Sequence, residues 1–106
     1  MPKYLSIGSY TTDGLKGVLK DGGTKRVQAA KQLVEGLGGK LEAFYFAFGD
    51  ADFIMITEGP SNIGTIAGTL IANATGAVKI KTTVLIEPEE VDQAIKRTAE
   101  YRPPGQ

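Results

Sequence analysis

The sequence predicts an α+β fold, in which helices pack on one face of a four-stranded antiparallel sheet. Two segments alternate apolar and polar residues with the period of two that is typical of half-buried strands, and two more are runs of aromatic and β-branched residues of strand length. Two longer segments repeat apolar residues at spacings of three and four, as a helix packed on a core does. With 106 residues, of which 42% are hydrophobic, the chain suits a single domain over residues 1–106.

Turn-forming residues separate the expected strands. In the first strand Leu5 and Ile7 alternate with more polar neighbours. The second and third strands are rich in aromatic and β-branched residues, and Gly49-Asp50-Ala51-Asp52 between them indicates a hairpin. The predicted strands are residues 3–10, 41–48, 53–57 and 78–86.

Capping residues and glycines mark the ends of the expected helices. Thr24 caps the first main helix, Gly38-Gly39 ends it, and Gly76 ends the second. Pro88 suits the first position of a last helix. The predicted main helices are residues 24–37 and 63–74, the second capped by Ser61 or Asn62.

Two further segments are expected to hold little regular structure. Residues 15–20 lie between the turn-forming residues 11–14 and the glycines at 22 and 23, so we expect one or two helical turns there at most. Residues 101–106 contain Pro103 and Pro104, which prevent the last helix from continuing.

The order strand, helix, strand, strand, helix, strand, helix predicts a ferredoxin-like arrangement with right-handed crossovers. The expected sheet order is four, one, three, two, with both main helices on one face. The second strand is apolar in both alternating sets, Phe44, Phe46 and Phe48 against Leu41, Ala43 and Tyr45. The second face therefore needs a cover, which a homodimer or higher homo-oligomer forming a dimeric α+β barrel would supply. The alternative is that the last helix folds back over it.

The composition excludes several kinds of chemistry. Lys and Arg equal Asp and Glu at twelve each, so no basic excess points to nucleic acid. The chain has no histidine and no cysteine, which removes the Ser-His-Asp triad, disulfides and the commonest zinc ligands. No acidic cluster has metal-site spacing, and we expect no metal and no cofactor. Without a signal peptide or an apolar span, we expect a cytoplasmic protein that binds no membrane.

Several short motifs together resemble the GYD domain family. They are Tyr10-Thr11 followed by Gly14, Lys25-Arg26, Gly38-Gly39-Lys40, Phe48-Gly49-Asp50-Ala51-Asp52, and Val78-Lys79 with Thr82. Gly49 and Asp52 match the Gly-x-Tyr-Asp signature, whereas Ala51 stands where the signature has tyrosine. The resemblance covers nearly the whole chain and implies a protein similar to the dimeric α+β barrels.

Polar residues are expected to converge at one edge of the sheet, where Tyr10, Asp52 and Lys79 or Lys81 meet. Neighbouring strands lie about 4.8 Å apart, so these side chains could contact one small ligand. Asp52, Tyr10 and Lys81 could serve as base, proton donor and charge partner. We expect the residues that line the barrel face and its pocket to be Tyr4, Ser6, Tyr10, Lys79, Lys81 and Thr83.

Structural roles compete with these assignments. Asp52 could cap the hairpin by accepting backbone N–H groups, and Lys79 and Lys81 could be solvated strand charges. Arg26, with Lys25 near a helix start, could bind an anion or simply lie in a solvated first turn.

Three functions remain open from the sequence. The first is a homo-oligomeric small-molecule-binding or accessory protein whose pocket lies between sheet and helices. The second is a cofactor-free isomerase or monooxygenase that acts on a small organic substrate. The third is a purely structural oligomer, whose interior would be filled by side chains.

Overall fold

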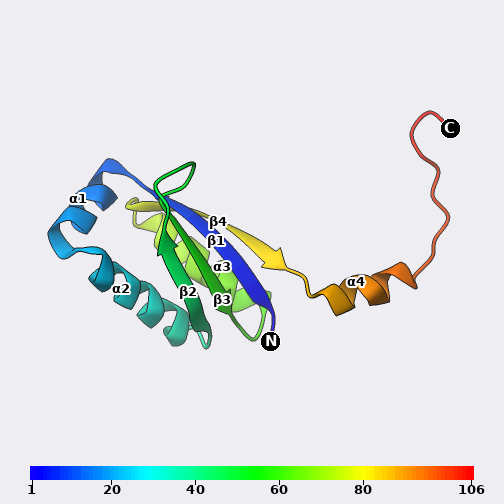
Figure 1. The fold of residues 1–106 in the computed structure, drawn as a ribbon, viewed down its shortest axis with the longest axis horizontal. Helices are drawn as coiled ribbons and strands as arrows, with labels where there is room; N and C mark the ends of the chain where they lie inside the picture. The colour runs from blue at the N-terminus through cyan, green and yellow to red at the C-terminus, as the bar shows by residue number, and fades with distance from the viewer.

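A computed structural model describes residues 1–106 (Figure 1). The chain forms, in order, β1 (Lys3–Tyr10), α1 (Thr12–Asp21), α2 (Gly23–Gly36), β2 (Lys40–Phe46), β3 (Phe53–Glu58), α3 (Asn62–Ala74), β4 (Val78–Leu85) and α4 (Pro88–Ile95). The predicted α+β class is confirmed, and the order of elements agrees with the prediction apart from α1, an additional helix.

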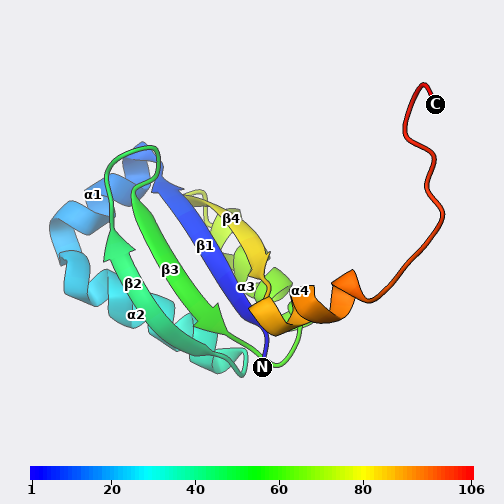
Figure 2. The ribbon, with the colours of Figure 1, turned by 45° about the vertical axis from the view of Figure 1, so that its right-hand side comes forward.

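The four strands form one sheet in the order β2-β3-β1-β4, and each neighbouring pair is antiparallel. This is the ferredoxin-like order expected from the sequence. Figure 2 looks onto the sheet, with α2 and α3 behind it. α2 packs mainly on β2 and α3 mainly on β4, so that both main helices cover the same face.

The segment after β1 was predicted wrongly, because α1 has ten residues rather than one or two turns. Thr11 acts as its N-cap: the Thr11 hydroxyl accepts a hydrogen bond from the Gly14 N–H, with 3.3 Å between the two heavy atoms. Gly14 is buried where a Cβ would meet the Ala77 carbonyl oxygen at 2.0 Å. The same residue types suit a turn or a helix start, and packing on residue 77 favours the helix.

β2 ends two residues earlier than predicted and contains a bulge. Phe48 has a left-handed backbone (φ 52°), which bends the chain out of the strand. The register shifts between Leu41 and Ala43. Leu41 therefore pairs with Thr57 toward the helices, whereas Ala43 pairs with Ile56 on the other face. The bulge divides an apolar set that the sequence pattern assigned to a single face.

The core lies between the sheet and the two helices α2 and α3. Tyr4 is 1% exposed, and its hydroxyl donates to Asn62 Oδ1 at 2.8 Å. The ring of Phe53 stacks on Phe44, with 5.2 Å between their centroids. Phe53 occupies the space above Gly8, where an added Cβ would lie 2.1 Å from the ring. Glycine at position 8 thus lets an aromatic ring cover the middle of β1.

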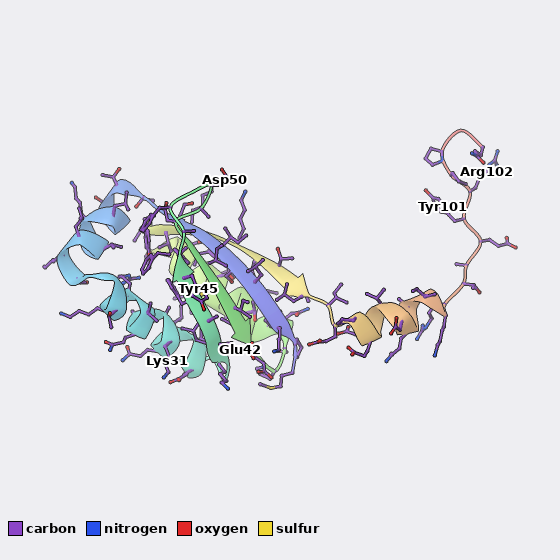
Figure 3. The ribbon with its side chains drawn as sticks, viewed as in Figure 1. Lys31, Glu42, Tyr45, Asp50, Tyr101 and Arg102 are labelled. Atoms are coloured by element: carbon purple, nitrogen blue, oxygen red, sulfur yellow. The ribbon has the colours of Figure 1, made fainter.

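The opposite sheet face is uncovered. It is apolar over the middle of β1, β2 and β3 and mostly polar along β4. We call it the open sheet face, and its apolar members are Leu5, Ile7, Ala43, Tyr45, Ile54, Ile56 and Leu85. Tyr45 is 71% exposed on β2 (Figure 3). At one end of this face Lys3 Nζ pairs with Glu42 Oε2 at 3.2 Å.

α4 does not cover the open sheet face, so the alternative of a last helix folded back over the sheet is wrong for this chain. α4 and the residues after it extend away from the sheet (Figures 1 and 2). Ile95 on α4 is 73% exposed. The radius of gyration is 17.1 Å, against about 13 Å for a compact chain of this length. As predicted, the tail is not helical, and Arg102 Nε donates to the Gln106 carbonyl near its end (Figure 3).

None of the helices combines the length and apolarity that crossing a membrane would require. The cytoplasmic location expected from the sequence stays a prediction.

Candidate functional site

The predicted pocket residues lie on two different faces of the sheet. Tyr4, Ser6 and Tyr10 face the helices: Tyr4 bonds Asn62 of α3, and the Ser6 hydroxyl lies 3.1 Å from that of Thr82, which lies 3.0 Å from that of Thr69. Residues opposite one another in an antiparallel pair share a face, so β4 presents Val78, Ile80 and Thr82 to the helices. The predicted members on the opposite, open face are Lys79, Lys81 and Thr83.

The expectation of one shared barrel face is therefore wrong, and β1 explains why. Leu5 and Ile7 are its larger apolar residues, but they lie on the open sheet face. Gly8 faces the helices because it makes room for Phe53. The polar tips of Tyr4 and Ser6 are tolerated there because each finds a hydrogen-bond partner.

Asp52 holds the hairpin against the end of β1. Its Oδ2 accepts a hydrogen bond from the Tyr10 backbone N–H at 2.7 Å. Its own N–H donates to the Gly8 carbonyl at 2.8 Å, and its carbonyl accepts from the Ala47 N–H at 2.8 Å. These bonds match the capping role weighed for Asp52. Because Lys81 lies on the other face, Asp52, Tyr10 and Lys81 are not assembled around one space within the chain.

A cavity of about 190 Å³ lies between the sheet, α2 and α3. Phe44, Phe53 and Met55 line it from the sheet. Small residues leave the space open: Ala29 and Ala30 line it from α2, and Ala72 lines it from α3. A smaller cavity of about 60 Å³ adjoins it, sharing Leu33, Met55 and Ala72.

Two polar groups lie together among these apolar walls. Tyr10, from the end of β1, and Arg26, from the first turn of α2, both line the larger cavity. Burial raises the pKa of the Tyr10 phenol above its ordinary value of 10.0; the Arg26 guanidinium opposes this rise, and the Asp52 carboxylate adds to it. Arg26 forms no ion pair with any carboxylate of the chain. The apolar space thus carries an uncompensated cation at one side.

Sequence reasoning found only part of this cavity. It singled out Tyr10 and Arg26 but assigned them to different features, and it treated Phe44 as packing. The floor residues Phe53 and Met55 and the three alanines were missed. The available signal was the pair Ala29-Ala30 on the apolar side of a helix, where larger side chains would fill the space. No group of three or more acidic side chains lies close enough together to hold a metal ion.

The sheet order and the helices on one face define a ferredoxin-like α+β protein, here with an apolar cavity between sheet and helices. The family model for the GYD domain matches residues 4–95, from β1 to the end of α4, and the chain belongs to the GYD domain family. The search of curated proteins finds no match. Within the family signature, Gly49, Ala51 and Asp52 fall in the β2–β3 hairpin.

Proposed function

We propose that this protein is a homo-oligomeric small-molecule-binding protein whose ligand occupies the cavity between the sheet, α2 and α3. The observation that carries the proposal is the size and lining of that cavity. Its volume of about 190 Å³ exceeds the roughly 150 Å³ that suffices for benzene in an apolar protein cavity. It is smaller than the roughly 300–1,000 Å³ of drug-sized sites. The expected ligand has about one ring or a short chain.

The apolar lining of the cavity, which is partly open to solvent, supports an occupant. Water gains few hydrogen bonds there, because Arg26, Thr75 and the Tyr10 hydroxyl are the main polar groups of the lining. An apolar ligand that displaces this water would be stabilised by roughly 25 cal/mol per Å² of apolar surface that it buries.

The homo-oligomeric part of the proposal is supported by the open sheet face. Its central pair, Ile7 and Ile54, lies beside Leu5, Ile56 and Tyr45 with no helix over them. An apolar sheet face of this kind is a typical self-association surface, and two copies related by a twofold axis would cover each other.

The binding proposal is tested through Met55, which lines the cavity. The chain has two methionines, so labelling their methyl carbons gives two NMR signals. Toluene is expected to shift the Met55 signal and to leave that of Met1 unchanged. Ala72→Leu should abolish the shift, because the larger side chain fills the space lined by Ala72.

Ala74→Leu is the matched control, since Ala74 is exposed at the end of the same helix and lines neither cavity. This variant should keep the toluene response of the native protein. A Met55 signal that no small apolar compound shifts would overturn the proposal and favour the purely structural oligomer.

The isomerase or monooxygenase hypothesis is a weaker candidate within this site. It assigned the base role to Asp52, whose carboxylate is bonded to the Tyr10 N–H, and a charge role to Lys81, which lies on the open sheet face. Tyr10 alone of the three residues lines the cavity.

A further inference from the structure

We propose that the ligand of the cavity is a small apolar carboxylate, whose carboxylate group binds the Arg26 guanidinium and the Tyr10 hydroxyl while its apolar body fills the space above Phe44 and Phe53. The inference rests on the proposed binding function and specifies its ligand class. It concerns the one charged side chain among the cavity-lining residues.

Arg26 carries a positive charge without an anionic partner. Arg26 is half-buried and lines the cavity, and none of the three ion pairs of the chain includes it. A partly desolvated guanidinium gains from an anionic partner, because a charge-assisted hydrogen bond is stronger than a neutral one. Its planar fork of donors fits a carboxylate in particular.

The Tyr10 hydroxyl has a proton that it can donate to an anion beside Arg26. A guanidinium only donates hydrogen bonds, so the phenol beside it keeps its own O–H proton free for another acceptor. A phenol with the ordinary pKa of 10.0 is protonated at neutral pH, and burial raises the pKa of Tyr10 further, so its hydroxyl can donate to an anion. Arg26 also lies in the first turn of α2, whose positive end adds to the local potential.

Asp52 is the one nearby charge that opposes an anion. The negative charge of Asp52 adds to the rise in the pKa of the Tyr10 phenol. The carboxylate nevertheless accepts a hydrogen bond from the Tyr10 backbone N–H and does not line the cavity. The rest of the lining is apolar apart from Thr75. A dianion or a sugar would leave polar groups unpaired against this lining, whereas a monocarboxylate with an apolar body would not.

The test compares acids with neutral compounds of the same shape. Phenylacetate is paired with phenylacetamide, and hexanoate with hexanamide, and each is titrated while the Met55 methyl signal is followed. We expect each carboxylate to bind at least about tenfold more tightly than its amide, as a charge-assisted pair implies. Arg26→Gln should remove this preference without weakening amide binding, Arg26→Lys should retain part of it, and Tyr10→Phe should reduce it.

Lys31→Gln is the matched control, because it removes a cation from the same helix that pairs with Glu35 at 3.9 Å and does not line the cavity (Figure 3). It should leave the preference unchanged. Equal binding of acids and amides, or a preference that survives Arg26→Gln, would overturn the ligand class while leaving the binding function intact. If neither acids nor amides nor toluene shift the Met55 signal, the binding function itself fails.

Discussion

At the residue scale, the ring of Phe53 lies directly over Gly8 of β1. The Cβ of any other residue at position 8 would lie 2.1 Å from the Phe53 ring, closer than carbon atoms can pack. Phe53 is 3% exposed and is in ring contact with Tyr10 and Phe44, at 5.2 Å between centroids in each pair. Displacing it would disturb both the core and the floor of the cavity.

Gly8→Ala is therefore expected to destabilise the fold by about 1 to 3 kcal/mol, the usual cost of overpacking. The measurement is the free energy of unfolding in urea. Gly17→Ala is the control, because Gly17 lies in α1 with nothing within 4 Å of an added Cβ. This variant should be stabilised by roughly 0.5 to 1 kcal/mol through helix propensity. A Gly8→Ala protein as stable as the native one would contradict the contact.

At the scale of elements, Thr11 joins the end of β1, the start of α1 and the turn before β4. Its hydroxyl accepts from the Gly14 N–H at 3.3 Å and donates to the Gly76 carbonyl at 2.8 Å. The Thr11 backbone N–H also donates to the Ala77 carbonyl at 3.0 Å. One side chain thus starts a helix and fixes a loop 65 residues away.

Thr11→Ala should cost about 1 kcal/mol of folding free energy, because the hydrogen bonds of the hydroxyl to Gly14, Gly76 and Ala77 are lost. Thr11→Ser keeps the hydroxyl and should retain most of the stability. Urea unfolding measures both values, and amide hydrogen exchange in α1 should accelerate in the alanine variant. If the alanine and serine variants were equally stable, the capping role would be refuted.

At the scale of the whole molecule, the uncovered sheet face and the extended C-terminal segment leave one side of the sheet without a partner. Ile54 lies near the middle of the open sheet face, paired with Ile7 on β1 and Tyr45 on β2. A charge at this position would be solvated in a single chain but buried between two stacked sheets. A charge at residue 54 should therefore disrupt the stacking of two copies far more than it disrupts the folding of one chain.

Light scattering is expected to give the native protein about twice the chain mass of 11.2 kDa, or a higher multiple. Ile54→Lys should reduce the mass to that of one chain, with the far-UV circular dichroism of the folded protein retained. Ile66→Lys is the control, because Ile66 is 56% exposed on α3, away from that face. A native protein that remains a single chain at micromolar concentration would contradict self-association.

The sequence by itself determined the class, the sheet order and, apart from α1, the order of elements. These follow from periodicity and capping within short segments, which is why β1, α3 and the start of α4 were predicted nearly to the residue. The position of Asp52 in a hairpin was likewise predicted from neighbouring turn-forming residues. Of the candidate site, the sequence identified Tyr10 and Arg26, but not that they share one cavity.

Tertiary contacts alone decided which face of β1 meets the helices and where the cavity lies. Tyr4 and Ser6 can face the helices because their hydroxyls form hydrogen bonds with Asn62 and Thr82, which lie 58 and 76 residues away along the chain. The cavity likewise depends on small residues of α2 and α3 that lie over the rings of Tyr10, Phe44 and Phe53. The periodicity of a sequence gives the spacing of apolar residues along one helix or strand. It does not tell which distant residues will form hydrogen bonds with that element or fill the space beside it.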